Sequence, residues 1–152
     1  MERDLVEKLL SQKFVATCWT EASARIAIKA KFRCEYCGEP LYKSARRLFN
    51  LQHDHLIPRW AGGKCHIEGD VMNTVHSCNV CNTIKHRFDP RNKLAVPFTG
   101  TTPESDEMRT ALIDIAREHI NDKLQGKSWA CEDNIKRYRE IIGNFDGVET
   151  DR

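Results

Sequence analysis

The sequence has no long hydrophobic run and few aromatic residues. No stretch of its 152 residues approaches the roughly 20 apolar residues that a membrane-spanning helix needs. The first four residues, Met1 to Asp4, have neither the basic start nor the apolar run of a signal peptide. Aromatic residues make up 8% of the chain and hydrophobic residues 40%, which excludes membrane and collagen-like classes and indicates a modest core. We therefore expect a cytoplasmic protein of one ordinary domain, with no membrane partner.

Cysteine, by contrast, is abundant, with seven in the chain. Disulfides are rare in the cytosol, so clustered cysteines there indicate metal binding or catalysis. Two Cys-x-x-Cys pairs can supply four thiolates to a tetrahedral zinc ion, two from each turn. We predict a structural zinc site formed by Cys34, Cys37, Cys78 and Cys81. The alternative is four unligated thiols or one redox pair. The other three are predicted to be free thiols: Cys18, Cys65 and Cys131.

The formal net charge of +2 conceals an uneven distribution. Residues 1–30 carry a net charge of +1, residues 31–93 carry +5 and residues 94–152 carry −4. Both cysteine pairs lie in the basic middle segment. A basic segment of this size suits a polyanion such as nucleic acid, although charge alone does not identify the partner.

The hydrophobic pattern predicts an α+β chain in which helices flank a cysteine-rich centre. Leu5 to Leu10 show helical spacing, and Thr20 is a suitable N-cap for a second helix that ends near Lys31. The three predicted parts are an N-terminal helical extension over 1–30, a core over 31–93 and a C-terminal helical extension over 94–152.

Within the centre, the pattern predicts two short strands and a helix. Residues 48–57 are rich in Leu, Phe and Ile and are predicted to be extended, with Pro58 at the end. Thr74 to His76 are predicted to form a second strand. A short helix should begin near Cys78 and stop before Asp89.

The C-terminal part is predicted to form two amphipathic helices. Thr102 followed by Pro103 is a good helix start, and Gly126 is a suitable stop. Residues 135–142 then predict a last helix, capped by Gly143. The acidic charge and apolar faces of these helices suggest a surface for a homodimer or a partner protein.

Polar residues between and after the cysteine pairs permit metal-assisted hydrolysis. Asp54 and Asn82 can supply the oxygen ligands that Mg²⁺ prefers. His55, beside the carboxylate, can act as a general base near neutral pH. Neighbours on a strand point to opposite faces, so Asp54 and His55 would converge on one substrate only where the strand ends or twists. Asn82 and Lys85 are near one another on the following helix.

At these positions the sequence resembles the HNH endonucleases, in their zinc-knuckle subgroup. The resemblance covers about residues 25–88 of the chain. Its motifs are Phe32-Arg33-Cys34-x-x-Cys37-Gly38, Asp54-His55-Leu56-Ile57-Pro58-Arg59, Gly62-Gly63, Asn73 and Cys78-x-x-Cys81-Asn82-x-x-Lys85.

The resemblance implies a ββα-metal fold that hydrolyses DNA phosphodiester bonds with one catalytic divalent ion, Mg²⁺ or another. Asp54 and Asn82 would be metal ligands, His55 the general base and Asn73 a brace for the loop after the first strand. The family also admits His where this chain has Asn82, and the loop between Gly63 and Asn73 looks longer than usual. Asn82 has an alternative role as the N-cap of its helix.

Several side chains near these motifs are candidates for phosphate contact. Trp60 could stack against DNA or pack in the core. The predicted nucleic-acid-binding residues are Arg59, Lys85, His86 and Arg87. Two other functions stay open: a zinc-stabilised nucleic-acid-binding module without catalysis, and the nuclease subunit of a larger defence or packaging complex.

Overall fold

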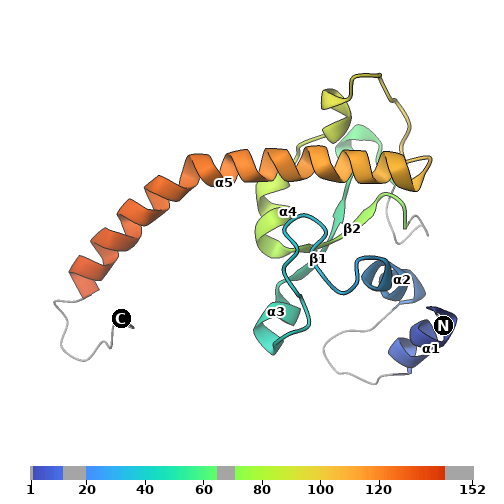
Figure 1. The fold of residues 1–152 in the computed structure, drawn as a ribbon, viewed down its shortest axis with the longest axis horizontal. Helices are drawn as coiled ribbons and strands as arrows, with labels where there is room; N and C mark the ends of the chain where they lie inside the picture. The colour runs from blue at the N-terminus through green and yellow to red at the C-terminus, as the bar shows by residue number, and fades with distance from the viewer. Residues whose placement is uncertain (1, 12–19, 65–70, 143–152) are drawn as a thin grey trace. The chain divides into compact units, whose positions relative to one another are not determined.

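The computed structural model describes residues 2–11, 20–64 and 71–142 (Figure 1). The chain divides into two compact units, residues 1–120 and residues 121–152. In chain order the elements are α1 (Glu2–Leu10), α2 (Glu21–Lys29), α3 (Ala45–Phe49), β1 (Leu51–His55), the 3₁₀ turn η1 (Arg59–Ala61), β2 (Thr74–Cys78), α4 (Asn79–Lys85), the 3₁₀ turn η3 (Pro90–Lys93) and α5 (Asp106–Ile142). The predicted α+β class is confirmed at this level.

The sheet consists of β1 and β2, which pair antiparallel. Leu51 lies opposite Cys78 at one end of the ladder, and His55 lies opposite Thr74 at the other. The predicted strand at Thr74 is therefore confirmed, and it extends to Cys78. Because α4 begins directly after β2, the second cysteine pair lies where the strand gives way to the helix.

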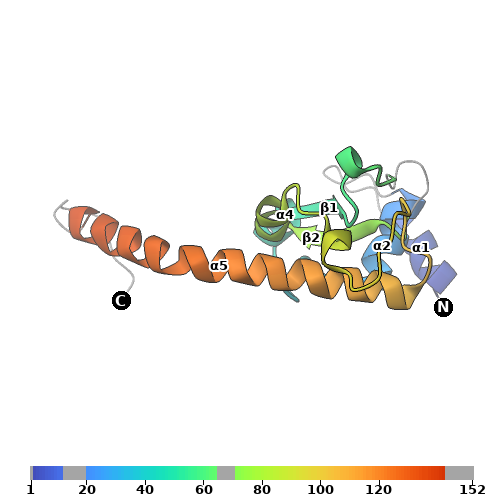
Figure 2. The same ribbon diagram turned by 90° about the horizontal axis from the view of Figure 1, so that it is seen from above.

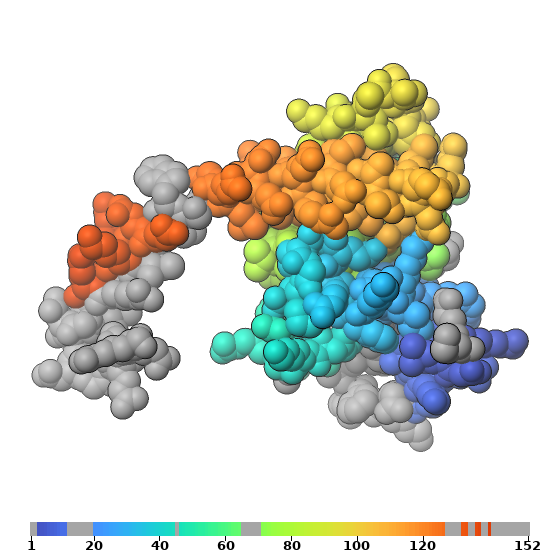
Figure 3. Space-filling model, viewed as in Figure 1, coloured from blue at the N-terminus to red at the C-terminus, as the bar shows by residue number. Residues whose placement is uncertain are grey.

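The core of the first unit lies between the sheet, the cysteine-rich turns and the start of α5. Leu56 and Val75 from the sheet region pack with Leu112, Ala116 and Ile120 from α5, and all five side chains are at most 1% exposed. Figures 1 and 2 show the first part of α5 running beside β2, and Figure 3 shows it directly against the segment that follows α2. Burial of this apolar face explains why the helix docks there.

The predicted N-cap of α2 is confirmed. The Thr20 hydroxyl accepts a hydrogen bond from the Ser23 amide at 3.1 Å, and the Thr20 amide donates to the Ser23 hydroxyl at 2.8 Å. This reciprocal pair is a capping box, which satisfies two amides that the first helical turn leaves without partners. Ile26 and Ala27 are then buried on the inner face of α2.

Two element predictions were wrong. Residues 48 and 49 belong to helix α3, because the Ser44 hydroxyl caps the turn by accepting the Arg47 amide at 3.3 Å. In the C-terminal part, Gly126 does not stop a helix, and α5 is one helix of 37 residues. A helical glycine costs only about 1 kcal/mol relative to alanine, so good helix formers on both sides can carry the helix through it.

The start of α5 also differs from the prediction. The helix begins at Asp106 rather than after Thr102, because the Ser105 hydroxyl accepts the Met108 amide at 3.2 Å. Of the helices that the structure describes, none is both long and apolar enough to cross a bilayer.

Candidate metal centre and adjoining polar site

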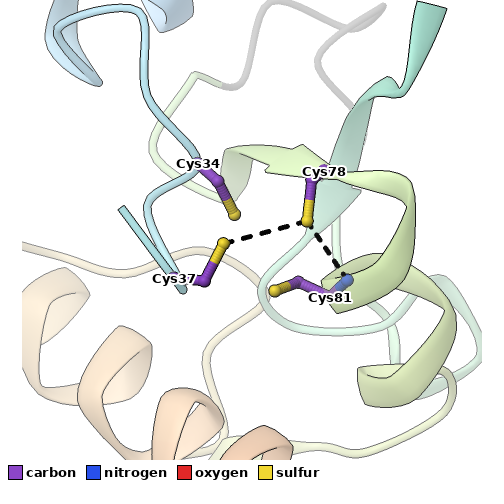
Figure 4. A group of neighbouring side chains, drawn as sticks. All are labelled: Cys34, Cys37, Cys78 and Cys81. Carbon is purple, nitrogen blue, oxygen red and sulfur yellow. Dashed lines mark hydrogen bonds between the residues drawn. The ribbon is translucent and has the colours of Figure 1, made fainter. Parts of the chain in front are cut away.

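The four paired cysteines form one cluster at the junction of β2 and α4. Their sulfur atoms all lie within 4.8 Å of one another, and Figure 4 shows the side chains pointing toward a common centre. A tetrahedron of thiolates at 2.3 Å from zinc has sulfur–sulfur edges of about 3.8 Å. The Cys37 and Cys78 sulfurs are 3.9 Å apart. The cluster is therefore compatible with zinc, as the sequence predicted.

Local backbone geometry explains why each pair can present two thiols. In the first pair, the Gly38 amide donates to the Cys34 carbonyl at 2.8 Å, and Gly38 has a φ of 76°, a conformation that glycine adopts without strain. In the second pair, Cys78 is the N-cap of α4 and its sulfur accepts the Cys81 amide at 3.4 Å. Asn82 is therefore not the N-cap, which excludes that alternative.

The thiols share protons in a way that suits a metal site. Hydrogen bonds from the thiols of Cys34 and Cys81 lower the pKa of Cys78 well below its usual value. The hydrogen bond to Cys78 raises the pKa of Cys34 to about 12, and hydrogen bonds with Cys34 and then Cys78 raise the pKa of Cys81. One thiolate is thus already favoured within the cluster, and a zinc ion would displace the remaining protons.

Tyr36, inside the first knuckle, reaches the neighbouring polar site. Its hydroxyl donates a hydrogen bond of 2.7 Å to Asp54 Oδ2. Burial, followed by the negative charge of Asp54, raises the pKa of Tyr36 well above 10. The phenol therefore stays protonated and acts as a permanent donor to this carboxylate.

Lys85 contacts the same carboxylate from α4. Its ammonium group lies 3.1 Å from Asp54 Oδ2 and donates at 2.8 Å to the carbonyl of His55. Lys85 is 1% exposed and Asp54 is 7% exposed, so this ion pair is buried. β1 ends at His55. Asp54 and His55 would point to opposite faces within a continuous strand, so this strand end is what the two side chains need in order to act on one substrate.

Asn73 braces the loop that follows β1. Its side-chain carbonyl accepts the Ile57 amide at 2.8 Å, and its amide group donates to the carbonyls of Ile57 and Lys64 at 3.0 and 2.9 Å. Gly63 lies against this bridge, where an added Cβ would be 1.8 Å from the Ile57 carbonyl oxygen. The backbone after His55 is therefore fixed by a fully buried asparagine and a glycine that no larger residue can replace.

The other predicted site residues fall into two groups. Asn82 is partly buried on α4, three residues before Lys85. Arg59, His86 and Arg87 are exposed. Lys85, by contrast, is buried and forms an ion pair with Asp54. The described residues include neither Cys18 nor Cys65, and the side chain of Cys131 also lies outside them, so the free thiols stay a prediction.

Sequence reasoning missed the residues that attach α5 to the first knuckle. Arg109, which is 5% exposed, forms a two-pronged ion pair with Glu35, with N–O distances of 2.7 and 3.0 Å. It also donates to the carbonyls of Thr74 and Met72 at 2.8 and 3.1 Å. The available signal was an arginine three residues before Leu112, on the apolar face of a predicted helix.

Arg117 adds a second attachment between α5 and the first knuckle, because it donates at 2.9 Å to the carbonyls of both Glu35 and Tyr36.

Comparison of the chain with protein-family models, with curated proteins and with solved structures found no significant match.

Proposed function

We propose that the protein is a metal-dependent endonuclease of HNH type, which hydrolyses DNA phosphodiester bonds. The observation that carries the proposal is the meeting of Asp54, His55 and Lys85. Lys85 comes from a helix 30 residues further along the chain, yet it contacts the carboxylate of Asp54 and the carbonyl of His55. These residues all belong to the motif on which the resemblance rests.

The order of elements supports the finer fold that the proposal needs. A ββα-metal unit has two antiparallel strands followed by a helix, and β1, β2 and α4 occur in that order. On this proposal, the cysteine cluster is a structural site that fixes the end of β2 and the start of α4. A small unit of this kind needs such a staple, because its own core is thin.

The donor set of the polar site fits a hard divalent cation such as Mg²⁺. Asp54 offers a carboxylate and Asn82 an amide carbonyl. When bound, the ion would neutralise negative charge on the phosphate and on the leaving oxygen. The ammonium group of Lys85 now compensates the charge of Asp54, so it must share the carboxylate with the cation or withdraw toward the His55 carbonyl.

The remaining roles follow from the contacts of the chain itself. His55 takes a proton from the attacking water, a contribution of about 10²- to 10⁴-fold in rate. Asn73 holds the backbone after His55 through its three hydrogen bonds to Ile57 and Lys64. Tyr36 and Lys85 orient the carboxylate of Asp54.

The test is plasmid cleavage by the zinc-loaded protein with and without added Mg²⁺. His55→Ala should lower the rate at saturating DNA by about 100-fold or more, because no general base remains. His86→Ala removes an exposed imidazole outside the proposed catalytic centre and should leave that rate within about threefold of wild type, since an exposed phosphate contact acts mainly on affinity. Undiminished cleavage by His55→Ala would remove His55 from its role.

One observation favours a second function, a zinc-stabilised nucleic-acid-binding module without catalysis. Lys85 already neutralises Asp54 at 3.1 Å, as a purely structural ion pair would. On this alternative, DNA binds but no divalent ion accelerates its hydrolysis. A plasmid that stays intact with Mg²⁺ and with Mn²⁺, under conditions where the protein shifts it on a gel, would favour the binding module.

A further inference from the structure

An exposed tryptophan lies near the proposed active-site residues in the sequence, and it contacts Arg87, two residues after Lys85. Trp60 follows His55 by five residues and is 58% exposed, so the core-packing alternative for this ring is wrong. The guanidinium carbon of Arg87 lies 5.7 Å from the centroid of the ring, within the range of a cation–π contact. This contact joins the turn after β1 to the residues directly after α4.

The turn that carries Trp60 is held firmly. Arg91 donates to the Ala61 carbonyl at 2.9 Å and to the Gly100 carbonyl at 2.7 Å, while its ion pair with Asp89 is largely buried. Gly62 closes the turn in the left-handed region, with a φ of 86°. An aromatic ring that is both exposed and positioned in advance can bind a flat ligand with little loss of conformational freedom.

The surroundings of the ring favour an anionic ligand with an aromatic group. Arg59 precedes Trp60 in the turn and is exposed, and the exposed Arg87 lies against the ring. Arg87 covers part of the ring, and the exposed remainder is available to a second partner. A nucleotide combines a flat base that can stack on indole with a phosphate that arginine can bind.

We propose that Trp60 and Arg87 form a stacking site for an unpaired nucleobase next to the phosphate that is cut. A base inside a duplex already stacks on both sides, so the indole can accept only a base that has left the stack or has no partner. The inference rests on the proposed function and names its substrate class: DNA with a single-stranded, gapped or flapped segment at the cleavage position.

The first experiment measures binding of full-length, zinc-loaded protein without added Mg²⁺. The probes are fluorescein-labelled 20-mers: a single strand, the duplex of the same sequence, and a single strand whose central bases are replaced by abasic sites. Wild type should bind the single strand more tightly than the abasic strand. Trp60→Ala should weaken binding of the base-bearing strand by about 5- to 100-fold and remove the preference for it.

Two variants serve as controls. Trp60→Phe keeps a smaller aromatic face and should retain part of the preference. Phe49→Ala removes another aromatic ring, which is 74% exposed and lies at the end of α3, two residues before β1 begins. This variant should change none of the affinities. Equal weakening of the base-bearing and abasic strands by Trp60→Ala, or no weakening at all, would overturn the stacking site.

A cleavage assay keeps the two proposals distinguishable. With Mg²⁺, wild type should cut gapped or flapped DNA faster than intact duplex, and Trp60→Ala should lose that difference while still cutting. Cleavage of all substrates at equal rates contradicts the stacking site and leaves the nuclease proposal standing. Base-dependent binding without cleavage of any substrate contradicts the nuclease proposal and leaves the stacking site standing.

Discussion

Asp54 receives two different donors on one oxygen atom. The phenol of Tyr36 and the ammonium group of Lys85 both contact Oδ2, at 2.7 and 3.1 Å, and all three residues are buried. A carboxylate that is held from two sides has one orientation before any metal arrives. The contact with Tyr36 also ties this orientation to the first knuckle, because Tyr36 lies between Cys34 and Cys37.

Tyr36→Phe tests this positioning role. The change removes the hydroxyl and keeps the ring, so unfolding in urea should cost about 1 kcal/mol less than in wild type. If Tyr36 orients Asp54 for a cation, the Mg²⁺ concentration that gives half-maximal cleavage should also rise several-fold. Tyr42→Phe removes a hydroxyl from a ring that packs on Phe32 and His76, and it should leave that concentration unchanged.

Lys85→Met tests the buried ion pair. Removal of one partner leaves Asp54 buried without its countercharge, so the free energy of unfolding should fall by about 3–5 kcal/mol. Asp54→Asn combined with Lys85→Met should recover much of this loss, because no charge then stays buried. Chemical denaturation of the two single variants and the double variant measures the coupling; simple additivity would contradict a direct pair.

At the scale of elements, α5 and the first knuckle depend on one another. Arg109 brings a two-pronged ion pair to Glu35 and two hydrogen bonds to the backbone before and within β2, while Arg117 holds the carbonyls of the knuckle. The amide of His76 also donates to Glu35. The start of α5 therefore fixes the first cysteine pair against the strand that leads to the second.

Arg109→Lys should separate the contribution of the two-pronged guanidinium contact from that of the positive charge. Lysine keeps the positive charge but cannot make the paired contacts of a guanidinium, so we expect a loss of about 2 kcal/mol in stability and weaker zinc retention. Arg137→Ala is the matched control on the same helix, because Arg137 is 72% exposed and pairs with Asp133 only at 3.5 Å. A competition assay with a chromogenic chelator measures zinc affinity, and equal affinity in all three proteins would contradict the coupling.

Local signals predicted part of these elements and of the site. The capping box at Thr20, the strand at Thr74 and the clustering of the cysteines follow from residue type and spacing within a short window. The contact between Glu35 and Arg109 joins residues 74 positions apart, and no local pattern specifies such a partner. The helix through Gly126 was missed for a related reason, since the cost of one glycine is small against the sum of its neighbours.

At the scale of the whole molecule, the cysteine cluster closes a loop of 40 residues between Cys37 and Cys78, and this loop contains β1 and most of β2. Removal of the metal should therefore destabilise the entire first unit. Cys34→Ser should lose bound zinc and cooperative thermal unfolding together, as measured by elemental analysis and circular dichroism. Cys131→Ser serves as the comparison and should keep both; a cooperative melt without zinc would contradict a structural role.

The second unit, residues 121–152, should be dispensable for the first. A chain that ends at Gly126 should keep its zinc, and its free energy of unfolding should change by less than about 1 kcal/mol. If the C-terminal part carries the expected homodimer surface, sedimentation should show a dimer for the full chain and a monomer for the shorter one. If both chains sediment in the same oligomeric state, the homodimer surface does not lie in residues 127–152.

The ion pair between Glu35 and Arg109 also limits where the molecule can be divided or transplanted. An engineer guided by the motifs alone would cut after residue 93 and graft residues 31–93 onto another protein. Such a fragment would contain every residue of the zinc cluster and of the proposed catalytic site. It would nevertheless strand a carboxylate that is 12% exposed without its guanidinium. The smallest portable unit must therefore extend through Ile120, which packs in the core of the first unit, and swaps between related proteins should carry the first turns of α5 together with the knuckle.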